Sequence, residues 1–341
     1  MESKIKKFSL IKSQDYPEYD LKITLKPSFR CNQNCWFCSE YDNKSKLWTK
    51  EECDLVLHKL SGVPDSKQKL FFYFYGGEPT LNKHWEYLNL ELIKMFPDRE
   101  LFIQTQTNLS IKLNRLEAFL IEATNIKGTK HTIDICSSYH LGKQDVGDFA
   151  EKMDLCKRYS ACGKCFFSTE IPKERQMMDE FRFLSGRFPE EVKMKFTVIP
   201  KLKQRKLAGY EEVLEDGDLI GDDDGQYLEY RYYTRKYPEL LNFLEQSWNF
   251  EVDGDVMNYV DIKHNRIHEK FKYMSCSCGQ ESLVVDQNLN TFKCNDDCYN
   301  NINPVNISNV DMSTQFSNRS ICLNSECWDG LDFNKKTVTD V

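Results

Sequence analysis

Three cysteines lie close together in the stretch RCNQNCWFCSE near the start of the chain. The residues between Cys31 and Cys35 are polar, whereas cysteines that only fill a core are expected on strands or helices. Together with Cys38, these thiolates can bind three irons of a cube-shaped iron–sulfur cluster and leave the fourth iron open. A zinc ion would need a fourth ligand close by, and the nearest candidates, Cys53 and His58, lie on a predicted helix outside the loop. The spacing therefore favours a cluster.

Cysteine use and hydropathy indicate the cellular compartment. The chain has 14 cysteines among 341 residues, too thinly spread for a small disulfide scaffold. Its first residues, MESKIKKFSLIKSQDYPEYD, lack the continuous apolar run of a secretory signal, and no later stretch approaches the ~20 apolar residues of a membrane span. We expect a cytoplasmic protein with no membrane segment, whose thiols stay reduced. The net charge of −7 gives no basic surface for nucleic acid, so nucleic-acid binding is not expected.

The elements that must position the cysteine loop alternate along the chain. Thr49 and Glu52 form a capping box that predicts the start of the helix KEECDLVLHKL. Strand followed by helix, repeated six times, predicts an α/β fold with a parallel sheet. The cysteine loop follows the first strand, at the carboxyl end where such folds bind ligands. The predicted strands are the apolar runs at 21–26, 70–75, 101–105, 132–136, 166–171 and 195–199.

Composition divides the chain into four parts. Residues 1–20 are an N-terminal arm, and residues 21–200 carry the alternating strand and helix pattern. Residues 201–270 are charged, aromatic and irregular, which predicts a linker or lid region. Residues 271–341 form a small cysteine-rich unit.

Two motifs of the second part resemble those of the radical S-adenosylmethionine (radical SAM) superfamily. CNQNCWFC fits the CxxxCxxC signature, including the aromatic Phe37, and YFYGGEPTL is similar to the GGEP segment that follows the second strand in that superfamily. The order and separation of the motifs also agree. The resemblance implies a partial (β/α)6 TIM-like barrel. It also implies that Cys31, Cys35 and Cys38 hold a [4Fe-4S] cluster whose open iron binds S-adenosylmethionine.

The resemblance also implies a set of cofactor-binding residues at the strand ends. Gly76 and Gly77 permit close backbone approach to a ligand, and Glu78 offers a carboxylate to an ammonium group. The segment QTQTNLS resembles the QTN segment of the family, and ICSSYH stands where relatives have a serine that contacts the ribose. The positions assigned in this way are Gly76, Gly77, Glu78, Pro79, Thr107, Asn108, Ser137 and Ser138.

The C-terminal cysteines look like the beginning of a SPASM or twitch extension. A CxxG turn at Cys276 is followed by a hairpin that ends at Cys294, with Asn288 to Asn290 at its tip, where asparagine tolerates positive φ. A SPASM domain needs more thiolates than this segment has, which favours one auxiliary cluster. Cys278 and Cys298 are spare thiols or alternative ligands, and structural zinc is the alternative to a cluster. The expected ligands of an auxiliary [4Fe-4S] cluster are Cys276, Cys294, Cys322 and Cys327.

The family's chemistry is reductive cleavage of S-adenosylmethionine to a 5′-deoxyadenosyl radical that abstracts hydrogen from substrate, with electrons from an external donor such as flavodoxin or ferredoxin. An auxiliary cluster suits a net oxidation, so the first hypothesis is oxidative modification of a peptide or protein side chain, by an oxidoreductase or maturase. The alternative is a dehydrogenase acting on a small metabolite such as a sugar or natural-product intermediate. A noncatalytic metal-binding interaction protein is a third possibility, disfavoured by two intact motifs.

Overall fold

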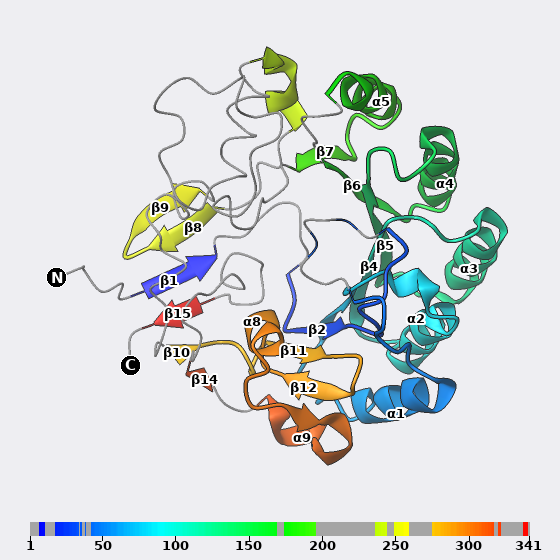
Figure 1. Cartoon of the computed structure of the whole chain (residues 1–341). Coiled ribbons are helices and arrows are strands. Elements are labelled where there is room, and N and C mark those ends of the chain that lie inside the picture. Colours follow the sequence, from blue (N-terminus) through cyan, green and yellow to red (C-terminus); the bar gives the residue numbers. More distant parts are fainter. Residues whose placement is uncertain are drawn as a thin grey trace.

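A curved parallel sheet with helices on its outer side positions the predicted site. The computed structural model describes residues 7–10, 18–33, 35, 38, 42–168, 174–195, 236–243, 249–258, 275–316, 320–321 and 337–339. The parallel strands are β2 (Leu21–Leu25), β3 (Lys69–Phe74), β4 (Glu100–Thr107), β5 (His131–Tyr139), β6 (Cys162–Ser168) and β7 (Val192–Lys195). The helices between them are α1 (Lys50–Leu60), α2 (Trp85–Met95), α3 (Leu113–Ile126), α4 (Val146–Arg158) and α5 (Glu174–Arg187). Figure 1 shows the sheet as an open arc with these helices along its outer side.

The predicted α/β fold with an unclosed parallel sheet is confirmed. The predicted strands at 21–26, 70–75, 101–105, 132–136 and 166–171 are present as β2 to β6, whereas the predicted strand at 195–199 shares only Lys195 with β7 and its other residues lie outside the described part of the chain. β6 begins at Cys162, four residues before its predicted start, because pairing with β5 extends over a stretch with no strand pattern. β7 begins at Val192, three residues before its predicted start, through pairing with β6. Of the predicted linker or lid region at 201–270, only 236–243 and 249–258 lie within the described residues.

Helix α1 begins as the capping box predicts. The Thr49 hydroxyl accepts a hydrogen bond from the backbone N–H of Glu52 (3.3 Å), and the Glu52 carboxylate accepts one from the backbone N–H of Thr49 (2.9 Å). These two bonds satisfy amides that have no partner within the helix.

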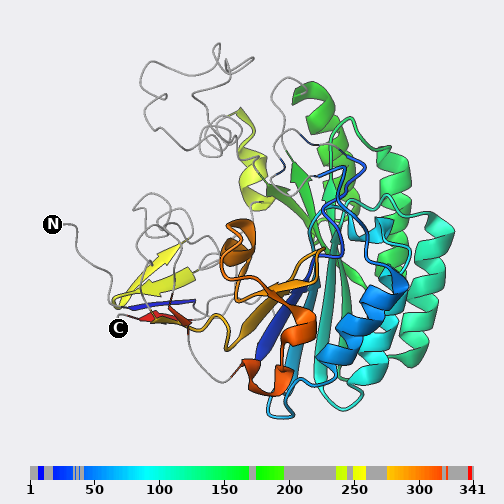
Figure 2. The ribbon, with the colours of Figure 1, turned by 60° about the horizontal axis from the view of Figure 1, so that its bottom comes forward.

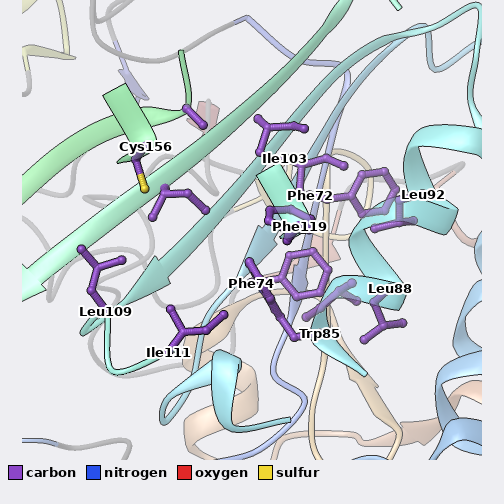
Figure 3. Packing of buried hydrophobic residues seen from close by; sticks show 14 of the residues in the cluster. Phe72, Phe74, Trp85, Leu88, Leu92, Ile103, Leu109, Ile111, Phe119 and Cys156 are labelled. Atoms are coloured by element: carbon purple, nitrogen blue, oxygen red, sulfur yellow. The ribbon is translucent and has the colours of Figure 1, made fainter. Parts of the chain in front are cut away.

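The main core lies between the helices and one face of the sheet. Alternate strand residues point to this face, among them Phe72 and Phe74 of β3 and Ile103 of β4. Figure 3 shows them against Trp85 of α2 and Phe119 of α3. The Trp85 and Phe119 ring centroids are 4.5 Å apart. Each fully buried side chain of this kind contributes roughly 1.5–3 kcal/mol.

The opposite face of the sheet, inside the arc, carries aromatic and polar side chains. In the register of β2, β3 and β4, Lys22, Phe71 and Phe102 form one layer, and Tyr73 with Gln104 forms part of the next. The Lys22 ammonium lies 5.2 Å from the Phe71 ring centroid and 4.7 Å from that of Tyr73. The inside of the arc therefore differs chemically from the apolar core outside it.

Three C-terminal strands continue the sheet beyond β2. They are β11 (Ser282–Val285), β12 (Asn290–Phe292) and β13 (Val305–Asn306), and β11 pairs with β2 in parallel. The Trp48 indole N–H also donates to the main-chain oxygen of Asp286 (3.2 Å). At the hairpin tip the residue with positive φ is Leu289, at 65°, and not an asparagine. The Asp286 carboxylate accepts from the amides of Asn288 and Asn290 (2.8 Å each), which fixes the turn without glycine.

A second, smaller sheet joins segments from both ends of the chain. In spatial order it contains β14 (Ser320–Ile321), β10 (Ser275–Cys276), β15 (Thr337–Thr339), β1 (Lys7–Leu10), β8 (Asn249–Val252) and β9 (Asp255–Asn258). Figure 2 shows β1, β8, β9 and β15 on the side of the large sheet away from α1 to α5. No helix within the described residues is long and apolar enough to cross a membrane.

Candidate functional site

The cysteine loop contacts loops that follow other strands at the carboxyl edge of the sheet. The Asn108 side-chain amide, just after β4, donates to the Cys31 thiol over 3.6 Å. The His140 ring nitrogen Nδ1, just after β5, lies 3.6 Å from the Cys35 thiol. Two predicted cysteine ligands are thus each held against a side chain from another strand end.

The two glycines after β3 are required by the cysteine loop itself. Gly76 has φ 114°, and a Cβ there would lie 2.7 Å from the Ser28 carbonyl oxygen. A Cβ on Gly77 would lie 2.2 Å from the carbonyl oxygen of Arg30. The N–H groups of Gly77 and Glu78 donate to the carbonyls of Ser28 (2.9 Å) and Arg30 (2.8 Å). The close approach predicted for a ligand is therefore made by the chain's own backbone.

Glu78 ties the ends of β3 and β4 together. Its carboxylate is 1% exposed and accepts hydrogen bonds from the hydroxyls of Thr107 (2.6 Å) and Thr80. The backbone N–H groups of Asn108 (2.7 Å) and Thr80 (3.1 Å) also donate to it. Burial raises the pKa of Glu78, and these hydrogen bonds oppose the rise. Both oxygens accept hydrogen bonds from the protein, so Glu78 supports the site, and its predicted contact with an ammonium group stays a prediction.

Pro79 and Thr107 belong to the same buried network. Pro79 is the first residue of the short helix η1 (Pro79–Leu81), which the Glu78 side chain caps. Besides its bond to Glu78, the Thr107 hydroxyl accepts from the backbone N–H of Leu109 (3.0 Å). The GGEP and QTN segments are thus one hydrogen-bonded unit.

The thiol of Cys31 is half-buried and that of Cys38 is exposed. Burial raises the pKa of the Cys31 thiol, and the negative charges of Glu78 and Cys38 raise it further. Hydrogen bonds from the backbone of Gln33 and Asn32 act in the opposite direction and lower this pKa. Across the described residues, no three side chains of His, Cys, Asp or Glu lie close enough together to share one metal ion. Thiols with amide and imidazole nitrogens beside them fit the sulfur ligands of an iron–sulfur cluster.

The two serines of β5 face opposite ways. Ser137 is 2% exposed and hydrogen-bonds the buried thiol of Cys165, so it belongs to the core. Ser138 is the next residue and therefore points to the inside of the arc, in register with Phe166 of β6. Of the two predicted positions, only Ser138 is directed toward the interior.

A half-buried carboxyl that the sequence did not single out lies inside the arc. Asp134 of β5 accepts a hydrogen bond from Gln104 Nε2 (2.6 Å). A Cβ on Gly163 would lie 2.3 Å from the carboxylate, so glycine makes room for it. Burial raises the pKa of Asp134 to about 6, opposed by the Gln104 bond and the charge of Lys164. Its alternation with Ile133 and Ile135 was the available signal, because it places an acid on the inner face.

The C-terminal cysteines are only partly within the described residues. Cys276, Cys278 and Cys294 are buried, and Cys298 is half-buried. The CxxG turn is present, with Gly279 at φ 84°. Cys322 and Cys327 lie outside the described part of the chain. The structure thus shows three buried thiols near the hairpin, and the predicted ligand set stays a prediction.

Comparisons with known proteins agree with this geometry. Residues 25–172 match the family model described as the Radical SAM superfamily. The fold is similar to that of anSMEcpe with bound AdoMet and Kp18Cys peptide, at 17% identity and TM-score 0.53, over 87% of this chain and 80% of that one. A second anSMEcpe structure, with AdoMet and Cp18Cys peptide, gives 16% identity and TM-score 0.52 over 87% and 80%. No curated protein sequence matches the chain. The match over residues 25–172 identifies a radical SAM domain in this part of the chain, and the fold of the chain is similar to that of a protein with bound AdoMet.

Proposed function

We propose that this enzyme oxidises a side chain of a peptide or protein. The observation that carries the proposal is the meeting of the cysteine loop with Glu78, Asn108 and His140 at one edge of an open parallel sheet. With its cofactors bound, such a site supplies an electron that cleaves S-adenosylmethionine to methionine and a 5′-deoxyadenosyl radical, which takes a hydrogen atom from substrate.

Different residues hold the cluster and line the position of S-adenosylmethionine. Cys31, Cys35 and Cys38 hold the cluster, and Gly76 with Gly77 lets the cysteine loop pack against the end of β3. The remaining cofactor-binding set lines or supports the position of S-adenosylmethionine, and Ser138 is preferred to Ser137 because it points inside the arc. That set is Glu78, Pro79, Thr107, Asn108 and Ser138.

The peptide substrate is supported by the likeness in fold to anSMEcpe, a structure of which has a Kp18Cys peptide bound. In a two-electron oxidation the substrate radical must lose an electron as well as a proton. We propose that the C-terminal cysteines, Cys276, Cys294, Cys322 and Cys327, hold an auxiliary cluster that accepts this electron. An external donor such as flavodoxin or ferredoxin supplies the electron consumed in cleavage.

The reaction is tested by anaerobic reconstitution, reduction and assay of 5′-deoxyadenosine. We expect about eight irons per chain, and about four in the Cys31, Cys35, Cys38 triple alanine variant, which should form no 5′-deoxyadenosine. A reconstituted and reduced parent chain that forms none would overturn the proposal. About four irons in the parent chain, none in the variant and retained zinc would make the C-terminal site structural and remove the argument for an oxidation.

The substrate class is tested separately with the peptide and small-molecule fractions of a cell extract. A peptide substrate predicts that the peptide fraction accelerates 5′-deoxyadenosine formation and that protease treatment abolishes the effect. Acceleration by the small-molecule fraction, unchanged by protease, would favour the dehydrogenase of a small metabolite.

A further inference from the structure

The loop after β5 contacts the cysteine loop through more than one side chain. His140 Nδ1 lies 3.6 Å from Cys35 Sγ, and the Lys143 ammonium donates to the Gln33 carbonyl (2.8 Å). Gln144 connects the partners, because its side-chain oxygen accepts from the His140 N–H (2.9 Å) and its amide donates to the Asn108 carbonyl. The main chain at His140 is therefore fixed relative to both Cys35 and Asn108.

The chemistry of the two side chains sets the direction of the contact. A ligating cysteine is a thiolate and can only accept a hydrogen bond, so Nδ1 must carry the proton when the loop holds a cluster. The imidazole ring then donates to the sulfur of Cys35, as the Asn108 amide donates to the sulfur of Cys31.

Resting on the proposed function, we propose that His140 is a positioning residue that acts through Cys35 and makes the bound cluster easier to reduce. A hydrogen bond to a ligating sulfur withdraws negative charge from it, and the reduced cluster carries one more negative charge than the oxidised one. The bond therefore stabilises the reduced state more than the oxidised state. Cleavage of S-adenosylmethionine requires the reduced state, so the contact favours the state that reacts.

The test is a reduction titration of the reconstituted full chain, followed by electron paramagnetic resonance. The relevant signal is that of the cluster whose spectrum changes when S-adenosylmethionine is added. For His140→Leu we expect the ratio of reduced to oxidised cluster at a fixed potential to fall about tenfold, a shift of about 59 mV to more negative potential. His140→Asn should restore most of the ratio, because its side-chain amide can donate from nearly the position of Nδ1.

A matched control is His58→Leu, which removes an exposed imidazole from α1 and should leave the ratio unchanged. An unchanged ratio in His140→Leu overturns the proposal, as does a His140→Asn variant that behaves like His140→Leu. A His140→Leu chain that fails to assemble the cluster makes His140 an assembly residue, and also overturns it. A parent chain with no reducible cluster would instead refute the proposed function.

Discussion

The half-buried carboxyl of Asp134 gives a quantitative prediction about stability. Asp134→Asn keeps an acceptor for Gln104 Nε2 and removes the charge. The pKa of about 6, against an ordinary value of 3.8, makes the ionised carboxylate cost the folded state about 3 kcal/mol, at about 1.36 kcal/mol per pH unit. We expect the variant to be more stable than the parent chain at pH 8 by up to about 3 kcal/mol.

The pH dependence fixes the sign of this effect. Because the folded-state pKa is raised, the protonated Asp134 carboxyl favours folding at low pH, and this stability is lost as pH rises through about 6. At pH 5 most of the folded-state carboxyl is protonated, so the advantage of the variant should fall to about half of its value at pH 8. Burial raises the pKa of the nearby Cys156 and Cys162 thiols, which stay neutral over this range.

Anaerobic urea unfolding at pH 5 and pH 8 measures the difference, with equal slopes for the two proteins. The control is Asp311→Asn at an exposed helix N-cap, where hydrogen bonds from Ser313 lower the pKa of the carboxyl. It should gain no stability between pH 5 and pH 8. An Asp134→Asn chain less stable than the parent at pH 8, or with the same gain at both pH values, would refute the reasoning that burial outweighs the Gln104 bond.

Three further substitutions and one control substitution test the site and its supports. Gly77→Ala should lower the iron content and destabilise the chain by about 1–3 kcal/mol, because the added Cβ meets the Arg30 carbonyl. The control is Gly186→Ala in α5, where a Cβ meets nothing within 4 Å. This control should stabilise the chain by about 0.5–1 kcal/mol. Glu78→Gln should lower the free energy of unfolding by about 1–3 kcal/mol, since one acceptor oxygen becomes a donor, and an unchanged urea midpoint would contradict these hydrogen bonds. Asp286→Ala should cost about 1–3 kcal/mol by leaving two hairpin amides without their acceptor, and no loss in urea would show that the turn holds without it.

The sequence predicted the cysteine loop and its place on the sheet because both depend on local patterns. Cys31, Cys35 and Cys38 lie within eight residues, and the strand before them has its own apolar pattern. The bonding of Glu78 was not predictable, because the Thr107 and Asn108 donors come from the next strand and reach it only through the β3 and β4 register. His140 was missed for the same reason, since a lone histidine after a strand carries no signal until the fold places Cys35 beside it.

The C-terminal hairpin shows more clearly that local sequence patterns do not predict contacts between distant segments. Its composition suggested a separate unit, and its asparagines suggested which residue would adopt positive φ. The structure places β11 against β2, and Leu289 adopts the left-handed conformation because the Asp286 side chain fixes the turn around it. Parallel pairing between distant segments leaves no trace in the residues beside either strand, since a strand of the main sheet and a strand of an added hairpin have the same alternation.

The pairing of β2 with β11 has a consequence for the order of events during synthesis. The paired residues Lys22 and Ser282 are 260 positions apart, so one edge of β2 stays without its neighbour until most of the chain has been made. At typical rates of translation this interval lasts on the order of 10 to 50 s. An open edge of this kind can recruit another strand, which makes the nascent chain prone to mispairing and to dependence on chaperones. The loop that holds Cys31 directly follows β2, so this loop reaches its final position only after β11 has paired with β2. Expression conditions that slow aggregation should therefore raise the yield of protein able to accept iron.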